Sequence, residues 1–527
     1  MADYRDRLQS KMEKEEESTE SSLPPSPYGP IGSTPGDVRA VQRQEGRDGP
    51  QFFAAFAATL GNLVMGTCIG WSSPAGPLLA KPEEEDGFSL SDDENSWVGC
   101  LMPAGALLGG QVGGLLMTKL GRKGAMMTGA AMFAVSYLLL VVAPNVWIIY
   151  VGRFFTGVCT GICSIVCPVY VAETATASRR GFLGSCVQLM VTFGVMLVVV
   201  IGIFGSWRWI SISCLVMTAI WMGALVFVPE TPAYYLSKRK YREARESLEW
   251  LRGTIHVEEE YGDILKSVEE SANLSAGLGD LFNSSNLAPF IISLWLMLGQ
   301  QFSGMNAVMF YCVSIFQQSG SSLNSNVANI IVSGVMIVAT IIAALVMDRA
   351  GRRILLNLSS SIMVISIGVL GAFFYIADNM GDEDLAKKIE FIPVASLSLF
   401  VFAFSIGFGP IPWLMMSELF SPEVKSLASS ISTTFNWTLA FLVTKFFTTM
   451  VAAVTEAGAF WMFGGFTILT FLFCFLFVPE TKGKSLDEIQ QLFRSDKPYF
   501  LNIGPWRICR GEDSEDRRVI VEEEVYS

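Results

Sequence analysis

The sequence predicts an all-α membrane protein with twelve transmembrane helices, arranged as two pseudo-symmetric halves of six helices each. The composition is that of a membrane chain: 51% of the 527 residues are hydrophobic, 16% are charged, and the mean hydropathy is +0.44. Apolar runs of bilayer-spanning length recur from residue 51 to residue 478. Three charged motifs also occur twice, in the same order, once in each half. Such a duplication is typical of two-lobed transporters.

The apolar runs set the expected spans, because a helix needs about 20 apolar residues to cross the hydrocarbon core. When Gly, Ser and Thr are tolerated, we expect twelve spans at residues 51–80, 96–118, 124–143, 146–171, 182–204, 207–228, 289–318, 326–347, 354–377, 391–417, 426–451 and 457–478. Gly and Pro are frequent inside these runs, which favours helices that bend around a cavity.

The rest of the chain divides around these spans. We expect a disordered tail over 1–50, a six-helix half over 51–228, and a loop with short helices over 229–288. A second six-helix half over 289–478 and a tail over 479–527 follow.

Lysine and arginine near the span ends predict the orientation, because these residues favour the cytoplasmic side. Nine of them fall on the side that carries the repeated motifs: Lys119, Arg122, Lys123, Arg179, Arg180, Arg349, Arg352, Arg353 and Lys425. We call this side the motif face and expect it, with both termini, to be cytoplasmic. The plasma membrane is the default location, because neither tail shows an acidic dileucine signal.

The repeated motifs place charges beside hydrocarbon. Leu120-Gly-Arg-Lys123 recurs as Ala350-Gly-Arg-Arg353, and Pro229-Glu-Thr231 recurs as Pro479-Glu-Thr481. Glu173 with Arg180 likewise recurs as Glu418 with Lys425. Charges in such positions need partners and mark function.

We therefore expect ion pairs that hold the motif-face ends of the helices together, forming when the cavity faces outward and separating when it faces inward. The expected members of this latch are Arg122, Glu173, Arg180, Asp348, Arg352, Arg353, Glu418 and Lys425. The alternative is that these charges only orient the chain in the membrane.

Amides inside the spans are the candidate binding groups. An amide donates and accepts at once, which suits the hydroxyls of a neutral sugar. The expected substrate-binding residues are Gln188, Gln300, Gln301, Asn306, Trp413 and Asn436, with the indole of Trp413 lying against a sugar ring. Any single amide could instead bond a neighbouring helix, which is the simpler explanation for Gln188 or Asn436 taken alone.

Two spans contain helix breakers. Ser303-Gly304 weakens the seventh span, and Gly407 to Pro412 must interrupt the hydrogen-bond ladder of the tenth. We expect Pro410 and Pro412 to take part in gating.

Ionisable side chains are scarce at mid-membrane. The first span has none around Cys68, and Lys445 is explained by snorkelling to the outer interface. This favours passive, uncoupled transport. His256 is the only histidine and no spaced cysteine cluster is present, so we expect no metal, no cofactor, no catalytic residue and no enzyme activity.

At this point residues 50–495 resemble the sugar porter branch of the major facilitator superfamily. The resemblance rests on Gly152-Arg153, Pro168-Val-Tyr-Val-Ala-Glu173, Arg180-Gly181, Pro229-Glu-Thr-Pro232, Gln300-Gln-Phe-Ser-Gly-Met-Asn306, Asp348-Arg-Ala-Gly-Arg-Arg353, Gly409-Pro-Ile-Pro-Trp413 and Pro479-Glu-Thr-Lys-Gly483. Within this branch, the chain is most similar to the arthropod facilitated trehalose transporters and related hexose carriers. This finer resemblance rests on Phe408 to Met416, Phe435-Asn-Trp437 and Val443-Thr-Lys445.

The resemblance implies the major facilitator fold and substrate contacts from Gln188, Gln300, Gln301, Asn306 and Trp413. It also implies that Phe310 and Tyr311 close over the substrate from outside. Proton-coupled members carry an aspartate at the position of Cys68. Four positions depart from the glucose-carrier pattern and offer fewer hydrogen bonds: Met297, Met336, Ser405 and Ala440.

We therefore predict a facilitative, alternating-access transporter of a neutral sugar, with trehalose first. A hexose or polyol uniporter, a proton-coupled symporter and, more distantly, a non-transporting sugar sensor stay open. The expected partners are the sugar and the lipid bilayer, with no nucleic acid, and the expected functional state is a monomer.

Overall fold

The computed structural model describes residues 47–80, 89–176, 178–272, 277–320, 323–380, 389–484 and 486–493. All regular structure in these residues is helical, and ten of the described helical runs are long and apolar enough to cross a membrane. Two of them hold two spans each, because α4 (Asp92–Val141) breaks at Gly121 and α18 (Lys425–Phe477) breaks at Thr455. The described residues therefore contain the twelve spans that the sequence predicts.

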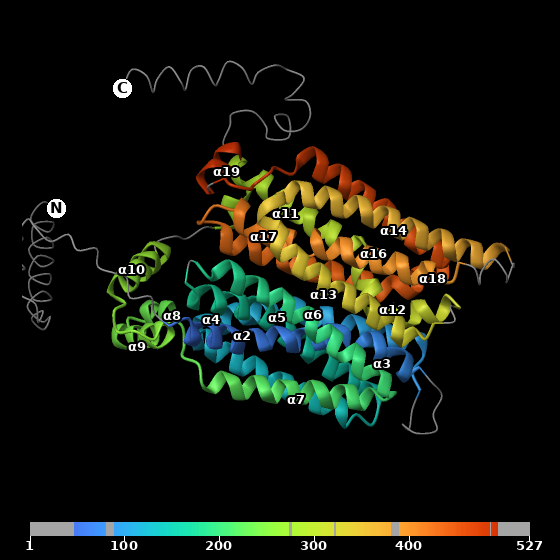
Figure 1. The fold of residues 1–527 in the computed structure, drawn as a ribbon, viewed down its shortest axis with the longest axis horizontal. Helices are drawn as coiled ribbons and strands as arrows, with labels where there is room; N and C mark the ends of the chain where they lie inside the picture. The colour runs from blue at the N-terminus through green and yellow to red at the C-terminus, as the bar shows by residue number, and fades with distance from the viewer. Residues whose placement is uncertain are drawn as a thin grey trace, which may run out of the picture. The chain divides into compact units, whose positions relative to one another are not determined.

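The spans form two groups of six, which lie side by side with their helices running in nearly the same direction (Figure 1). The N-terminal half consists of α2 (Asp48–Gly70), α3 (Ser72–Leu79), α4, α5 (Val146–Thr174), α6 (Arg180–Ile201) and α7 (Trp207–Val226). The C-terminal half consists of α11 (Ser284–Phe302), α12 (Met305–Gln318), α13 (Ser325–Ala350), α14 (Arg352–Met380), α16 (Ile392–Ile406), α17 (Ile411–Leu419) and α18.

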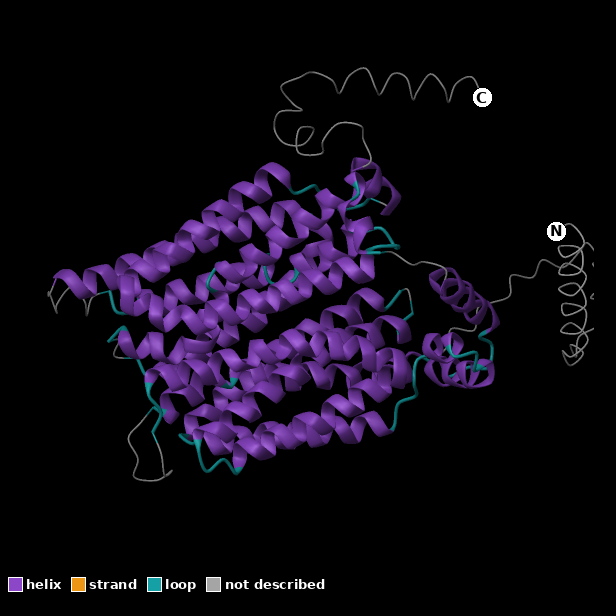
Figure 2. Ribbon diagram, turned by 180° about the vertical axis from the view of Figure 1, so that it is seen from behind, coloured by secondary structure: helices purple, strands orange, loops and turns teal. Residues whose placement is uncertain are grey.

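Short helices follow the two halves at one end of the bundle, which is the motif face (Figure 2). In the sequence, the N-terminal half is followed by α8 (Pro232–Ser237), α9 (Tyr241–Arg252), α10 (Glu258–Ala272) and the 3₁₀ turn η2 (Leu278–Phe282). The last span is followed by α19 (Leu486–Phe493). The predicted tails fall outside the described residues over 1–46 and 494–527.

Glycines set how closely the helices of the N-terminal half approach. A Cβ on Gly66 of α2 would lie 2.0 Å from the Val191 carbonyl oxygen of α6, and one on Gly194 would lie 2.1 Å from that of Leu63. Inside a bilayer the association of helices depends on this kind of close backbone contact, because lipid is as apolar as the side chains. The α2–α6 contact is thus built for small residues on both helices.

Two spans of the C-terminal half are broken at mid-membrane, which confirms the predicted weak points. The seventh span stops at Phe302 and restarts at Met305, and Gly304 between them has φ +86°. The tenth span stops at Ile406 and restarts at Ile411. Backbone groups freed at such breaks need side-chain partners, because the hydrocarbon supplies none.

Gly304 offers a test of the break in the seventh span. A Cβ there would lie 2.6 Å from the Phe463 ring, and a left-handed backbone costs an L-residue about 1–2 kcal/mol. We expect Gly304→Ala to lower the melting temperature of the detergent-purified protein. Gly465→Ala on α18 is the control, because its Cβ would meet nothing within 4 Å. Equal melting of the two variants would contradict this account.

Candidate functional site

A cavity of about 480 Å³ lies between the two halves. Its walls come from α2, α5 and α6 on one side and from α11, α12, α13, α16, α17 and α18 on the other. All six predicted substrate-binding residues line it: Gln188, Gln300, Gln301, Asn306, Trp413 and Asn436. None of the described residues that line the cavity is charged. Its size and mixed polar and apolar lining are those of small-molecule sites.

Hydrogen bonds link the amides of the C-terminal wall into a chain. Asn306 Nδ2 donates to Gln301 Oε1 at 2.5 Å, and Gln301 Nε2 donates to Asn436 Oδ1 at 2.9 Å. Asn436 Nδ2 in turn donates to Gln300 Oε1 at 2.8 Å. Gln300 and Gln301 are each only 6% exposed, so these bonds form in an environment with little competing water.

The chain ends on the break in the tenth span. Gln300 Nε2 donates to the carbonyl oxygens of Phe408 and Gly409, at 2.8 and 2.9 Å. These carbonyls lie between α16 and α17, where the helical ladder is interrupted. Pro410 and Trp413, which follow the break, line the cavity, whereas Pro412 is buried in the first turn of α17. The amides of the seventh span therefore hold the tenth span in place as well as facing the cavity.

The wall from the N-terminal half is less connected. Gln188 lines the cavity and is exposed although it lies in the middle of α6. The sequence reasoning missed six further polar or aromatic lining residues, namely Asn62, Ser164, Thr192, Thr340, Phe404 and Trp437. Helical spacing could have indicated Asn62, because it shares a face of α2 with Met65 and Ile69, which also line the cavity.

The two halves meet at the end of the bundle opposite the motif face, which we call the far face. Lys445 Nζ of α18 lies 2.7 Å from Asp93 Oδ1 and 2.8 Å from Ser96 Oγ of α4, and 4.3 Å from the centroid of the Trp97 ring. The side chain of Lys445 is thus bonded across the interface between the halves. Snorkelling alone, the explanation expected from the sequence, does not account for this position.

A second link between the halves lies deeper in the bundle. The Ser73 hydroxyl of α3 accepts hydrogen bonds from Asn329 Nδ2 of α13, at 3.1 Å, and from the Val313 amide of α12, at 3.4 Å. Together with Lys445, these contacts close the described far face by polar bonds from the C-terminal half to the N-terminal half.

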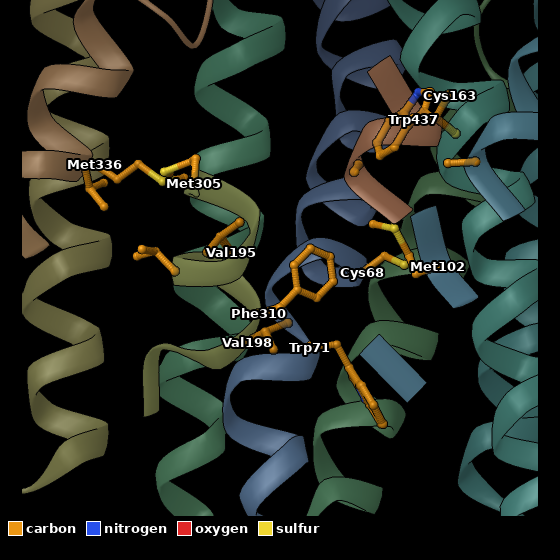
Figure 3. Close-up of a cluster of buried hydrophobic side chains, with 14 of the residues drawn as sticks. Cys68, Trp71, Met102, Cys163, Val195, Val198, Met305, Phe310, Met336 and Trp437 are labelled. Atoms are coloured by element: carbon orange, nitrogen blue, oxygen red, sulfur yellow. The ribbon is translucent and has the colours of Figure 1, made fainter. Parts of the chain in front are cut away.

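Phe310 and Tyr311, expected to close over the substrate, belong to this closed layer. Phe310 is 3% exposed and lies in one buried cluster with Cys68 and Trp71 of the N-terminal half (Figure 3). The Tyr311 hydroxyl donates to the Thr444 carbonyl oxygen at 3.2 Å. Both side chains therefore separate the cavity from the far face.

At the motif face, the repeated motifs of the N-terminal half meet. Arg122 Nη2 lies 2.7 Å from Glu173 Oε1. Glu230 accepts from the backbone amides of Arg122 and Lys123, at 2.9 and 2.8 Å, where the chain turns at Gly121 with φ +84°. Burial raises the pKa of Glu230, and these backbone hydrogen bonds oppose the rise.

The C-terminal half repeats the arrangement. Arg352 Nη2 lies 3.1 Å from Glu418 Oε1, and Glu480 accepts from the amides of Arg352 and Arg353, at 2.8 and 3.1 Å. Glu230 and Glu480 were not among the predicted latch residues. Their recurrence in the Pro-Glu-Thr motifs was the signal that could have identified them.

Each ion pair joins two residues of the same half: Arg122–Glu173 in the N-terminal half and Arg352–Glu418 in the C-terminal half. Both pairs are formed in a structure whose far face is closed. Lys425 Nζ donates to the Ser417 carbonyl oxygen at 3.0 Å, and Arg180 begins α6 and is exposed. Asp348 was also predicted to belong to the latch, but its side chain is not among those that the structure describes. These contacts of the predicted latch residues thus join helices of the same half, whereas Gln111 of α4 bonds Ser430 and Thr434 of α18 across the halves, at 2.9 and 2.8 Å.

Arg153 of α5 is fully buried beside Cys68. Its guanidinium donates to the carbonyl oxygens of Val98 and Cys68, at 3.1 and 3.2 Å, and to Ser72 Oγ at 2.7 Å. It also lies 4.8 Å from the centroid of the Trp71 ring. The charge of Arg153 is therefore surrounded by backbone carbonyls, a hydroxyl and an aromatic ring. In proton-coupled carriers, by the family resemblance, a carboxylate is expected at the neighbouring position of Cys68.

Comparisons with known proteins agree with this architecture. Residues 53–493 match the family model described as "Sugar (and other) transporter". The chain is 40% identical to "Facilitated trehalose transporter Tret1" of Culex quinquefasciatus, over 84% of this chain and 85% of that relative, and 40% identical to the Bombyx mori protein of that name, over 87% and 90%. The fold is that of the inward open, partially occluded xylose transporter XylE from E. coli (TM-score 0.69, 24% identity, 83% of this chain and 100% of that one). The chain belongs to the sugar transporter family of the major facilitator superfamily.

Proposed function

We propose that this protein is a facilitative, alternating-access transporter of a neutral sugar, with trehalose as the first candidate. The observation that carries the proposal is the uncharged cavity between the halves, in which a chain of amides faces an indole ring. Amides bond sugar hydroxyls as donors and acceptors, while Trp413 offers an apolar face to the ring. Gln188, Gln300, Gln301, Asn306, Trp413 and Asn436 are the proposed binding residues.

Uncoupled transport follows from the same lining. A coupling proton needs a titratable group near the substrate path, and none of the described cavity residues carries one. Arg153, which a carboxylate could otherwise use as its counter-ion, lies beside Cys68. The names of the relatives, facilitated trehalose transporters, support this choice over proton coupling.

The lining also supports a disaccharide over glucose. Met336 and Ser405 line the cavity at positions where, by the family resemblance, glucose carriers have an asparagine and a glutamate, so a hexose would find fewer hydrogen bonds there. A hexose or polyol uniporter is the second candidate, because the amide chain alone would serve either ligand.

For the transport cycle, we propose that the motif face is cytoplasmic, that the membrane is the plasma membrane and that the unit is a monomer. The bonds from Lys445 and Ser73 close the far face, and Gln188 is exposed, which supports an inward-facing state. The Arg122–Glu173 and Arg352–Glu418 pairs then keep each half rigid while the halves rock, instead of separating in this state.

The transport proposal predicts saturable uptake of labelled trehalose into oocytes that express the chain. An uncoupler should leave this uptake unchanged, because the cavity offers no proton site. Gln301→Ala breaks the amide chain at both of its neighbours and should lower kcat/KM by about tenfold or more, since each lost hydrogen bond is worth about 0.5–1.5 kcal/mol.

Gln318→Ala, an exposed amide outside the cavity lining, is the control for Gln301→Ala at equal surface expression. Uptake that collapses with the uncoupler would replace the uniporter by a symporter. Glucose uptake without trehalose uptake would keep the mechanism and change the substrate. Binding of trehalose without flux would favour the sensor.

The closed far face predicts a conformational readout. Lys445→Met should favour opening of this face, because it removes the bonds to Asp93 and Ser96. We would introduce Ser314→Cys, which lines a small pocket together with Phe310 and Tyr311, and follow its labelling by an impermeant maleimide added outside. We expect labelling to be about two- to fivefold faster, since partly exposed pairs are worth about 1 kcal/mol or less.

Asp92→Asn is the matched control, because its carboxylate neighbours Asp93 and has no salt bridge among the described residues. The parent chain with Ser314→Cys alone sets the reference rate, and the parent chain without it sets the background from native thiols. Labelling that responds equally to Lys445→Met and Asp92→Asn would refute the proposed lock.

A further inference from the structure

The N-terminal wall of the cavity contains an amide that no contact satisfies. Asn62 of α2 is 1% exposed and lines the cavity. Its side-chain oxygen is buried, and within the described residues no hydrogen bond to its amide group is found. Leaving a buried polar group unpaired costs more than a typical hydrogen bond contributes, because the group has lost its bonds to water, so its position requires an explanation.

Two other polar side chains on this wall, Thr192 and Ser164, are satisfied by their own helices, whereas Gln188 is exposed. Thr192 Oγ1 donates to the Leu189 carbonyl oxygen at 2.8 Å, and Ser164 Oγ donates to that of Gly161 at 2.8 Å. Asn62 differs from them, because its amide presents both a donor and an acceptor with no bond to a neighbouring carbonyl. A ligand in the cavity is the partner that its position makes available.

The two walls would therefore serve different parts of a ligand. On the C-terminal wall, the amides of Gln300, Gln301, Asn306 and Asn436 bond one another. In the proposed function, these amides bind the hydroxyls of one sugar ring. A ligand with a single ring that engages these amides and Gln188 leaves Asn62 without a partner. A ligand with two polyhydroxylated rings extends farther across a cavity that Asn62 and the amide chain line together.

We infer that Asn62 forms a second subsite, which binds hydroxyls of the second hexose unit of a disaccharide and so favours disaccharides over hexoses. The inference rests on the proposed sugar transport and deepens it: the amide chain binds one ring, and Asn62 recognises that another ring is attached. Because a hydroxyl donates and accepts, it can satisfy both ends of the Asn62 amide.

The test compares two substrates in one variant. Asn62→Leu keeps the branching and the number of heavy atoms of the side chain and removes its polar atoms. We expect the ratio of kcat/KM for trehalose to kcat/KM for glucose to fall about fivefold or more, which corresponds to the loss of one or two ligand hydrogen bonds. The readout is initial uptake of both labelled sugars, normalised to surface expression.

Asn357→Leu on α14 is the matched control. Asn357 also has a buried side-chain oxygen without a partner among the described residues, but it does not line the cavity. This control should leave the ratio at the parent value. If Asn62→Leu reaches the surface poorly, Asn62→Ser and trehalose titration of the purified protein, followed by tryptophan fluorescence, measure the same selectivity.

The outcomes separate the two proposals. Equal losses for both sugars, or an unchanged ratio, would overturn the second subsite and leave the transport proposal intact. A parent chain that takes up glucose but neither takes up nor binds trehalose would refute trehalose as substrate, and the subsite with it. A parent chain that binds trehalose without flux would refute transport, while fluorescence titration of Asn62→Leu would still test the subsite.

Discussion

The chain of amide hydrogen bonds from Asn306 to Gln300 is the interaction on which the rest of the site depends. Polar groups in the hydrocarbon region must find partners inside the protein. Here the amides of the seventh span satisfy one another and also the carbonyls of Phe408 and Gly409, which the break in the tenth span leaves free. One set of side chains thus stabilises an irregular backbone and presents donors and acceptors to the cavity. A substrate that competes for these bonds would act directly on the two broken helices.

The ends of the bundle differ in what they join. At the motif face, the Glu230 and Glu480 carboxylates cap the turns at Gly121 and Gly351, and each ion pair stays within its half. At the far face, Lys445 and Ser73 form bonds between the halves. Interactions within a half survive a rigid-body rotation, whereas interactions between halves must break. The contacts at the motif face therefore hold each half together, whereas the polar bonds between the halves come from Lys445, from Ser73 and from Gln111 of α4.

The two walls of the cavity also differ, despite the duplicated sequence. Charged motifs at the membrane surface recur in both halves, whereas within the described residues the amide chain belongs to the C-terminal half and the unpaired amide of Asn62 to the N-terminal half; the indole nitrogen of Trp437 on the C-terminal wall is also without a partner. The repeated parts are those that position helices, and the divergent parts are those that line the cavity. An asymmetric cavity suits an asymmetric set of contacts, even for a disaccharide made of two like rings.

The sequence by itself determined the twelve spans, the weak points at Gly304 and at Gly407 to Pro412, and the residue types of the binding wall, because bilayer thickness and backbone hydrogen bonding act locally. It also determined that the motifs repeat. Only the tertiary structure decided which groups meet across the bundle: that Lys445 pairs with Asp93 of the other half, that Glu230 and Glu480 cap the motif turns, and that Asn62 faces the cavity without a partner. These contacts join residues far apart along the chain, and their pairing depends on how whole helices pack and rotate, which no local pattern specifies.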